Sequence, residues 1–539
     1  MIVINEKFFQ RATLAVLCCV AVLIVLTFQH YGITWDEELQ SQYGQKIVDY
    51  YVSGFKDLGF AQLYNLYLYG GMFDGLASTF DRLTPFGLYP TRHLLNAVFG
   101  LLGLWGTWRL ARFIGQGAVG LTAVVLLVLT PMYYGHMYNN PKDIPFAAGI
   151  VWTLYYMSRC LSTLPRPPLR LLLKLGIIYG LTLGVRVGGI MAFLFWLVPL
   201  AVQAAEPLFQ SRYQWRAVLI NIWTTGWRLV VPVAVLSYLV MLGCWPWAQL
   251  SPIDNPLHAL NEFKDFPNAV EVLLDGTTYL STELPWFYVP LYFGVQLPGF
   301  VLLLLLTFFA TLPWIWRRLK EVPQRNALIL VLLMAFMPIL YAVGHRPALY
   351  DAVRHFLFAV PLMCIMAALG AKMLWIFCSK LLRHSHNHVV NRLFAASAAA
   401  GLAVVFILQI SLMITLHPYE YIYINQFAGG VPGAFGRYEL DYWGSSFKEA
   451  AERIQLYVSK HGGVPPGKII KIAICGPWDS AMIYLPPDYE AVEANDPADF
   501  FLSTTRWMCQ GMRGGKEIIR IKRLGVPLAI VKDVKDEKP

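Results

Sequence analysis

Long apolar runs separated by short polar stretches fill the first 416 residues of the chain. Most runs have about the 20 apolar residues that a helix needs to cross a bilayer. The pattern therefore predicts a polytopic α-helical membrane protein with about eleven transmembrane helices. We expect these helices near residues 12–29, 94–113, 117–134, 144–161, 170–186, 187–205, 228–247, 289–315, 327–344, 355–378 and 394–416.

The polar stretch between the first two apolar runs, residues 30–92, has a pattern of its own. Within it, the sequence QSQYGQKIVDYYVSGF alternates apolar and polar residues near the helical period. This spacing favours short interfacial helices that lie on the membrane surface. The Pro- and Asn-containing stretch 248–288 instead predicts an irregular loop.

After the last apolar run, the pattern becomes that of a small globular domain. The sequences KIIKIAIC (468–475) and VPLAIVK (526–532) predict strands, and SSFKEAAERIQLYVSK (445–460) predicts an amphipathic helix. A segment of about 120 residues is long enough to bury a core of its own. We therefore divide the chain into a transmembrane domain, residues 1–416, and a C-terminal α/β domain, residues 417–539.

The composition agrees with a membrane location. Of the 539 residues, 57% are hydrophobic and 14% are charged, whereas soluble domains have about 45–50% and about 25%. The formal net charge of +10 would fit a nucleic-acid partner only if the basic residues formed one patch. They are instead distributed in small groups between apolar runs, so we expect membrane lipid, and no nucleic acid, as a partner.

The basic groups also orient the chain. If the N-terminus is cytoplasmic, the large basic clusters all fall on the cytoplasmic side, which is the positive-inside pattern. These clusters contain Lys7, Arg11, Arg109, Arg112, Arg159, Arg166, Arg170, Lys174, Arg212, Arg216, Arg228, Arg317, Arg318, Lys320, Arg325, Lys380, Arg383 and Arg392. An odd number of spans then places the C-terminal domain outside the cytoplasm.

Ionisable residues gather at the opposite, external ends of the expected helices. The sequence YGITWDEELQ puts Asp36, Glu37 and Glu38 directly after the first span, where a carboxylate is costly unless it has water or a function. The other external clusters contain Arg92, His93, His136, Lys142, Asp143, Arg186, His345, Arg346, Asp351, Arg354 and His355. Any one cluster could be a salt-bridged helix end, but five clusters on one side favour a site.

The residue types in these clusters suit transfer from a lipid-linked phosphate. An arginine fork binds a phosphate bidentately and stays charged when partly buried. A nearby carboxylate can remove the proton of an attacking hydroxyl as a general base. The expected donor-phosphate ligands are Arg92, Lys142, Arg186 and Arg354. The expected substrate contacts at this end of the helices are His136, Asp351 and His355.

The sequence RYELDYWG, which follows the last span, contains a further group of candidates. It places Glu439, Asp441 and Trp443 close together. Carboxylates beside an aromatic ring suit sugar binding, because they accept hydrogen bonds from hydroxyls while the ring stacks on the apolar sugar face. A structural joint between the two domains fits the same residues equally well, and the sequence leaves both interpretations open.

The cysteines and the potential metal ligands do not by themselves establish a disulfide or a metal site. Cys475 and Cys509 could form a disulfide in the C-terminal domain, but sequence alone fixes no distance. His136 and Asp143 are candidate metal ligands beside Glu37, although their spacing matches no ligand motif. We therefore predict no metal site and no obligatory cofactor, with a divalent cation as the alternative.

Several of these motifs resemble a known family. TWDEE after the first span, an arginine at the start of the second and NNPKDIPFA after the third are similar to membrane glycosyltransferases of the C superfamily. The nearest branch is the bacterial protein O-mannosyltransferase and lipid A aminoarabinose transferase group. The resemblance implies Asp36 as the catalytic acid/base residue with Glu37 as its neighbour. It also implies that Asp143 is the acid of the second external loop and Arg92 the arginine on the phosphate side.

The resemblance implies an inverting transferase in the bacterial inner membrane. Its donor would be a polyprenyl-phosphate-linked sugar, and its acceptor a hydroxyl of a protein, lipid or glycan on the extracytoplasmic face. The C-terminal domain departs from the mannosyltransferases, which leaves the acceptor open. A transporter or flippase for a charged lipid is the alternative, but such a protein needs polar residues near mid-span. The expected helix centres, such as AVVLLVLT and LLLLLTFF, have almost none.

Overall fold

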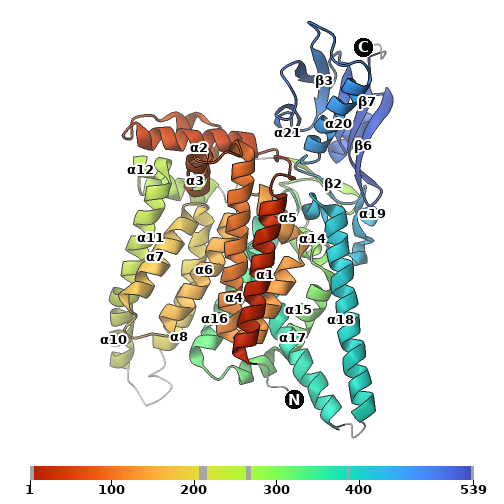
Figure 1. Ribbon diagram of the computed structural model, residues 1–539. Coiled ribbons are helices and arrows are strands. Elements are labelled where there is room, and N and C mark those ends of the chain that lie inside the picture. The colour runs from red at the N-terminus through yellow and green to blue at the C-terminus, as the bar shows by residue number, and fades with distance from the viewer. Residues whose placement is uncertain (1–4, 205–214, 263–268, 385–387, 536–539) are drawn as a thin grey trace.

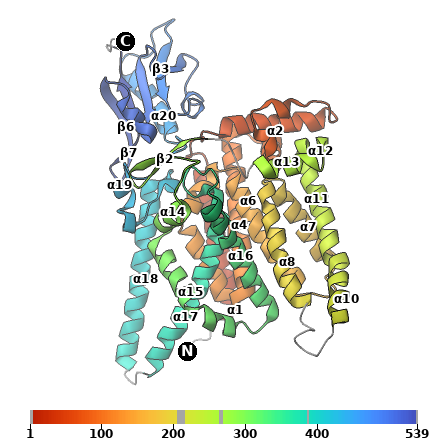
Figure 2. The same ribbon diagram turned by 180° about the vertical axis from the view of Figure 1, so that it is seen from behind.

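The computed structural model describes residues 5–204, 215–262, 269–384 and 388–535. Long helices run roughly side by side and form a bundle, and a β-sheet lies beyond one end of it (Figure 1). Seen from behind, the sheet stands over the helices α14 (Tyr288–Gln296) and α18 (His388–Leu416), on one side of the bundle (Figure 2). The predicted fold class, a polytopic helical membrane protein with a small C-terminal α/β region, is confirmed.

Among the described residues, eight helical segments are long and apolar enough to cross a membrane. Their lengths range from 18 to 41 residues, which covers the span of the hydrocarbon core. The segments are α1 (Glu6–Thr27), α4 (Leu88–Val128), Val187–Ala204 with α8 (Ile190–Ala204), Val218–Cys244 with α10 (Trp215–Thr225) and α11 (Val231–Cys244), α15 (Gly299–Arg318), α16 (Val322–His345), α17 (Ala359–His384) and α18.

Helix α4 contains two of the expected spans. Its helical geometry breaks at Gln116, where φ is 72° and ψ is −175°. The Tyr133 hydroxyl donates a hydrogen bond to the Gly100 carbonyl at 3.1 Å, so the chain folds back on itself after the break. Helix α6 (Asp143–Leu161) packs against α4, and α7 (Leu169–Leu183) packs against α6 and α11. Neither α6 nor α7 is among the eight segments named above. The expected number of eleven crossings therefore stays a prediction.

The first polar loop forms the interfacial helices that its pattern predicts. Helices α2 (Glu37–Val52) and α3 (Met72–Asp81) lie across the end of the bundle nearest the sheet (Figure 1). Tyr43, Ile47 and Tyr50 form the buried face of α2. The two helices approach closely at Gly44, because a Cβ there would lie 2.3 Å from the Asp74 carbonyl oxygen. The short 3₁₀ turns Gly59–Gln62 and Leu66–Leu68 connect them.

The stretch 248–288 has more regular structure than its sequence predicts. It contains most of α12 (Pro246–Leu250), all of α13 (Asp254–Glu262) and a hairpin of β1 (Glu271–Leu274) and β2 (Thr277–Leu280). Asp275 and Gly276 form the turn, with φ of 49° and 82°. An Asp-Gly pair with positive φ at both positions is a favoured two-residue hairpin turn. The prediction of an irregular loop was wrong here, because it gave Pro and Asn more weight than this dipeptide.

The C-terminal region, residues 447–533, folds as a five-stranded sheet with helices, and we call it the sheet domain. Strand order is β4-β3-β5-β7-β6, with β3 parallel to β4 and β5, and β7 antiparallel to β5 and β6. The two predicted strands and the predicted helix are confirmed as β3, β7 and α20. The elements are α20 (Phe447–Lys460), β3 (Ile470–Cys475), α21 (Asp479–Met482), β4 (Tyr489–Glu493), β5 (Phe500–Thr504), η8 (Arg506–Gly511), β6 (Lys516–Arg523) and β7 (Val526–Asp533).

Cys475 and Cys509 form a disulfide, the pairing that the sequence left open. Cys475 is the last residue of β3, and Cys509 lies in the 3₁₀ segment η8. The bond therefore ties η8 to the centre of the sheet. As shown below, η8 carries a residue that reaches the bundle.

Two segments distant in sequence join the bundle to the sheet domain. The segment between α18 and α20, residues 417–446, packs against the bundle, where the Asn425 side chain donates to the Leu297 carbonyl at 2.8 Å. The chain after α1 packs against the other side of this joint. There the Ile33 amide donates to the Tyr484 hydroxyl at 3.0 Å, and the Trp35 amide donates to the Trp443 carbonyl at 3.2 Å. A division of the chain at residue 416 therefore stays a prediction.

The orientation of the bundle can be tested with a reporter fused to the C-terminus of the full chain. The sheet domain and the N-terminus of α1, with Lys7 and Arg11, lie at opposite ends of the bundle (Figure 1). Because the positive-inside rule places those basic residues in the cytoplasm, we expect alkaline phosphatase to be active in this fusion. A fusion truncated after Lys320 should be inactive, and the reverse pattern would contradict the orientation.

Candidate active site

Asp36 lies at the junction of the bundle and the sheet domain, immediately before α2. It occupies the N-cap position, yet its side chain makes no capping hydrogen bond. An aspartate at this position usually accepts a bond from the first turn of the helix. The side chain is instead 47% exposed and lies 3.9 Å from the Arg354 guanidinium, measured from Oδ2 to Nη1. Asp36 is therefore open to a substrate and close to a cation.

Arg354 is the centre of a cluster of charged side chains. Its Nη1 lies 4.0 Å from Asp143 Oδ2, and its Nε lies 3.0 Å from Asp351 Oδ2. The side chain is only 7% exposed and packs between the rings of Tyr350 and Trp443. A buried guanidinium is tolerated only when carboxylates surround it. The arrangement fixes one edge of Arg354 on Asp351 and turns the other toward Asp36.

Asp143 holds a second arginine in the same cluster. Its Oδ1 lies 2.5 Å from Arg186 Nη2, and its Oδ2 accepts a hydrogen bond from Asn140 at 2.9 Å. Burial alone would raise the pKa of Asp143, but Arg186 and Arg354 outweigh that effect and lower it. Asp143 is therefore ionised at neutral pH and anchors both arginines, which suits it less to the role of a base.

Lys142 adds a further cation. Its Nζ lies 3.7 Å from the centre of the Tyr69 ring, a cation–π distance. Burial lowers the pKa of Lys142 to about 8, against the opposing influence of Asp74 and Asp36. The ammonium is thus charged at neutral pH and close to losing its proton.

The two candidate histidines are buried at the edge of the cluster. His136 contacts the Tyr442 hydroxyl and the Asn140 side chain, both at 3.2 Å. Burial lowers the pKa of His136 to about 3, and burial also lowers the pKa of His355 well below its ordinary value. Both imidazoles are neutral at physiological pH, so they add no charge to the site.

Two of the three candidates that follow the last span join the cluster. The Trp443 indole donates to Asp351 Oδ2 at 3.2 Å. Glu439 Oε1 lies 2.8 Å from Nε of Arg506, and Nη2 of Arg506 lies 3.1 Å from Asp351 Oδ1. Burial raises the pKa of Glu439 to about 8. Sequence reasoning missed Arg506, whose only local signal is its place just after β5 and three residues before Cys509.

Asp441 does not face the cluster. Its carboxylate accepts hydrogen bonds from the amides of Ser445 and Ser446, each at 3.1 Å, and from the Tyr421 hydroxyl. These contacts fix the turn that leads into α20. These contacts favour the structural interpretation for Asp441, because its oxygens already have partners within the protein.

Glu37 also departs from its expected role. Adjacent residues of a helix point about 100° apart, and Glu37 turns into the protein where Asp36 faces outward. Glu37 Oε2 accepts from the Thr34 amide at 2.8 Å, and its Oε1 lies 3.1 Å from His93 Nε2. It closes the turn before α2 and does not lie beside Asp36 as a second catalytic acid.

Arg92 lies behind the cluster and not within it. Its side chain is fully buried, and Nη2 lies 2.6 Å from Asp74 Oδ1. Among the expected donor-phosphate ligands, the structure therefore brings together Lys142, Arg186 and Arg354 and leaves Arg92 apart. The reason is that α3 covers Arg92 with Phe73 and Asp74, and the sequence does not reveal the position of this interfacial helix.

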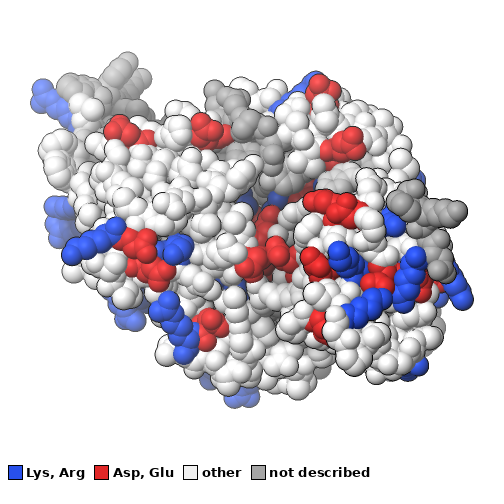
Figure 3. All heavy atoms as spheres, turned by 90° about the horizontal axis from the view of Figure 1, so that it is seen from above, with Lys and Arg blue, Asp and Glu red and all other residues white. Residues whose placement is uncertain are grey.

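The charges of the cluster nearly cancel. At neutral pH, four cationic side chains of the described residues face three aspartates, while Glu439 with its pKa of about 8 is mostly protonated. One positive charge is left over. Acidic side chains gather near the middle of the face that carries the sheet domain, and basic side chains show between them (Figure 3). The cations are Lys142, Arg186, Arg354 and Arg506, and the aspartates are Asp36, Asp143 and Asp351.

No metal-binding group stands out in the part of the chain that the structure describes. There, no three His, Cys, Asp or Glu side chains are placed to hold one ion. His136 and Asp143 are both hydrogen-bonded to Asn140, and Glu37 points away from them. The residues considered as ligands are thus engaged with protein groups.

Comparison with known proteins bears out the resemblance given by the motifs. Residues 90–227 match a family model described as dolichyl-phosphate-mannose-protein mannosyltransferase. This segment contains Lys142, Asp143 and Arg186. No curated protein matches the chain.

Two solved membrane proteins are similar in structure. ArnT from Cupriavidus metallidurans bound to undecaprenyl phosphate is 14% identical, with 98% of this chain and 99% of that chain covered and a TM-score of 0.48. The archaeal oligosaccharyltransferase AglB from Archaeoglobus fulgidus, in complex with an inhibitory peptide and a dolichol-phosphate, is 13% identical. For AglB the coverage is 91% of this chain and 69% of that chain, with a TM-score of 0.46. At these values neither likeness carries a functional conclusion.

The pairing of Arg92 with Asp74 predicts a structural role for both. Removing one partner of a buried pair leaves an uncompensated charge, which costs about 3–5 kcal/mol. We therefore expect Arg92→Met to lower the midpoint of thermal unfolding in detergent. The double variant Arg92→Met/Asp74→Leu, which buries no charge, should recover much of the loss.

The exposed pair of Arg82 and Asp49, at 3.8 Å, provides the control. Because exposed pairs contribute little, Arg82→Met should leave the midpoint unchanged. A donor-binding role for Arg92 would instead show as lost donor affinity in a protein of normal stability.

Proposed function

We propose that this protein is an inverting glycosyltransferase. It moves a sugar from a polyprenyl-phosphate donor to an acceptor hydroxyl on the extracytoplasmic face of the inner membrane. The family match over residues 90–227 supports the transferase class. One structural observation carries the proposal further: segments that line an apolar cavity, of a size that a lipid tail would fit, also carry residues of the charged cluster.

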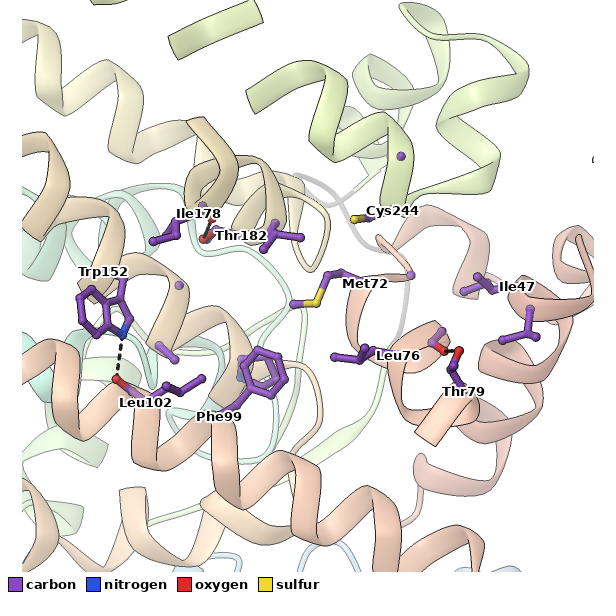
Figure 4. Close-up of a pocket in the computed structure, with 18 of the residues that line it drawn as sticks. Ile47, Met72, Leu76, Thr79, Phe99, Leu102, Trp152, Ile178, Thr182 and Cys244 are labelled. Carbon is purple, nitrogen blue, oxygen red and sulfur yellow. Dashed lines mark hydrogen bonds between the residues drawn. The ribbon is translucent and has the colours of Figure 1, made fainter. Parts of the chain in front are cut away.

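The cavity lies between the interfacial helices and the bundle and has a volume of about 960 Å³. Its wall is almost entirely apolar, with Met72 and Leu76 of α3 facing Phe99 of α4 across it (Figure 4). Trp152 of α6 and Thr182 of α7 line its far side. An apolar cavity of this size with a few polar groups at one end is typical of a ligand site.

Three segments that line the cavity also carry members of the cluster. Pro145 lines the cavity two residues after Asp143, and Gly71 lines it two residues after Tyr69, the ring under Lys142. Thr182 lines it as well, and its carbonyl accepts the Arg186 amide at 3.2 Å. A lipid whose tail occupied the cavity would therefore have its headgroup among the arginines.

The charge of the cluster fits the donor. A polyprenyl-phosphate sugar is a phosphodiester with one negative charge, and the cluster has one positive charge in excess. The donor phosphate would complete the charge balance without an ion from solution. We therefore propose no obligatory metal, with Lys142, Arg186 and Arg354 as the phosphate ligands.

The reaction needs one base and no acid. Asp36 removes the proton of the acceptor hydroxyl as its oxygen attacks the anomeric carbon of the sugar. The bond from that carbon to the phosphate oxygen breaks, and the phosphate leaves with the bonding electrons as an anion held by the cations. Attack from the face opposite the phosphate inverts the configuration. The acceptor hydroxyl belongs to a protein, a lipid or a glycan.

The role of Asp36 is tested by Asp36→Asn, which keeps the shape of the side chain but removes the proton acceptor. We expect turnover at saturating donor to fall by about 10²–10⁴-fold, the range for a general base. Donor binding should not weaken, because the variant removes a negative charge from the cluster. Turnover is measured with the purified chain in detergent, labelled polyprenyl-phosphate sugars and candidate acceptors. Without a membrane there is no gradient, so a transporter would give no product.

Glu38→Gln is the matched control, because Glu38 belongs to the same acidic run. Its carboxylate accepts from Gln42 at 2.7 Å and from the Tyr89 hydroxyl, within the interfacial layer. Glu38→Gln should lower turnover far less than Asp36→Asn does. Near-normal turnover of Asp36→Asn at saturating substrates would show that these carboxylates are structural.

The pKa values of Lys142 and Glu439, both about 8, predict a pH dependence of donor binding. As pH rises through 8, Lys142 loses a positive charge and Glu439 gains a negative one. Both changes remove the positive excess, while the phosphodiester keeps its single charge. The donor KM should therefore rise between about pH 7 and about pH 9, by up to about tenfold for each group.

Substitutions separate the two contributions. Lys142→Arg keeps its charge over this range, and Glu439→Gln cannot ionise, so each should reduce the rise and the double variant should flatten it. A donor KM that stays constant with pH in the wild type would contradict the assignment of charge to this cluster.

A further inference from the structure

Arg506 is a buried cation that belongs to the sheet domain but lies within the charged cluster of the bundle. Its side chain is 9% exposed and is held by three groups. Besides the ion pair with Asp351 and the contact of its Nε with Glu439, its Nη1 donates to the Tyr442 carbonyl at 3.0 Å. Arg506 itself makes no ion pair with Asp36 or Asp143 among the described contacts, so beyond its contribution to the charge of the cluster it acts on the donor through another residue.

We propose that Arg506 positions Arg354 for the donor phosphate by sharing the carboxylate of Asp351, which makes the sheet domain part of the active site. This inference rests on the proposed function. Arg506 would be a positioning residue and not a catalytic one, because it reaches the donor only through Asp351 and Arg354.

The geometry of Asp351 supports this sharing. Its Oδ1 faces Arg506 at 3.1 Å and its Oδ2 faces Nε of Arg354 at 3.0 Å, so the carboxylate bridges the two guanidiniums. A guanidinium is planar, and fixing its Nε edge fixes the direction of its other nitrogens. Asp351 thereby directs Nη1 of Arg354 toward Asp36 and Asp143.

The bridge also depends on backbone conformations that need support. Asp351 and Ala352 both have positive φ, 57° and 59°. Such a conformation is unfavourable for residues with a Cβ and persists only where surrounding contacts hold it. Arg506 and the Trp443 indole are the contacts on Asp351 from beyond the last span. Without Arg506, the carboxylate would act on Arg354 alone and could pull it from the donor.

The sheet domain holds Arg506 in place through η8. The disulfide ties this segment to β3 at Cys509. The Trp507 indole donates to the Glu271 carbonyl of β1 at 3.2 Å, and its ring packs on Trp35, the residue before Asp36. The segment that carries Arg506 is thus fixed to the sheet by the disulfide, and to β1 and Trp35 by Trp507.

The test compares the donor KM and kcat of Arg506→Met with those of the wild type. Loss of the bridge should raise the donor KM by about 10- to 100-fold, as expected when a ligating group is misplaced by about 1 Å. The acceptor KM and kcat at saturating donor should change little, because Asp36 is untouched. Arg506→Lys should give a smaller rise, since a single ammonium cannot reproduce the planar fork.

Arg520→Met is the matched control. Arg520 belongs to the same domain, pairs with Glu517 on the surface of β6 and is 48% exposed. It should match the wild type in donor KM. If Arg506→Met shifts the unfolding midpoint while the donor KM of the folded fraction stays normal, Arg506 is only structural and the inference is wrong.

A double-mutant cycle tests whether the effect passes through Asp351. In an Asp351→Asn background, Arg506→Met should add no further rise in the donor KM, because the shared charge is already absent. Additive effects would overturn the inference. The disulfide variant Cys475→Ser/Cys509→Ser should raise the donor KM in the same direction by a smaller factor, and it tests the same link if Arg506→Met does not fold.

Binding of a polyprenyl phosphate to the full chain in lipid nanodiscs separates this inference from the proposed function. Absence of binding to the wild type would overturn the proposed function. Binding to the wild type with equal affinity for Arg506→Met would overturn the inference and leave the proposed function standing. Binding to the wild type with weaker binding to Arg506→Met supports both.

Discussion

A guanidinium removed from water must be matched by carboxylates, and the charged cluster of this protein is arranged around that constraint at Arg354. Asp36, Asp143 and Asp351 reach it from three separate parts of the chain. None of these segments could move independently without leaving a charge unpaired in a buried place. The ion pairs therefore fix the start of α2, the start of α6 and the loop before α17 relative to one another.

The same constraint gives the joint between the bundle and the sheet domain a share in the charge balance of the cluster. Arg506 adds a fourth cation from the sheet domain, and it contacts both Asp351 and Glu439, which lies on the segment before the sheet domain. Because burial keeps Glu439 mostly protonated, the cluster retains a positive excess and does not neutralise itself. An apolar cavity whose lining segments also carry fixed cations is then suited to an amphiphile with an anionic headgroup.

Much of this site could be predicted from single residues. Asp36, Lys142, Asp143, Arg186 and Arg354 each follow or precede an apolar run, so their depth and side were readable from the chain. The structure departs from the expected arrangement where depth alone does not decide which residues meet. Glu37 and Arg92 have the right residue types at nearly the same depth, but a rotation of one helix position or the cover of α3 gives them internal partners. The sequence likewise left the role of Asp441 open, because it does not show that the amides of Ser445 and Ser446 are its partners.

The sequence by itself determined the membrane-spanning character, the interfacial helices, the strands β3 and β7, and the end of the bundle where the ionisable residues gather. These features depend on local hydropathy and periodicity, which each stretch of chain carries alone. Only the tertiary structure decided which charges pair, that a disulfide fixes η8, and that Arg506 enters the cluster from a domain about 150 residues after Arg354. Ion pairing acts over a few ångströms in space regardless of separation along the chain, so no local pattern records it.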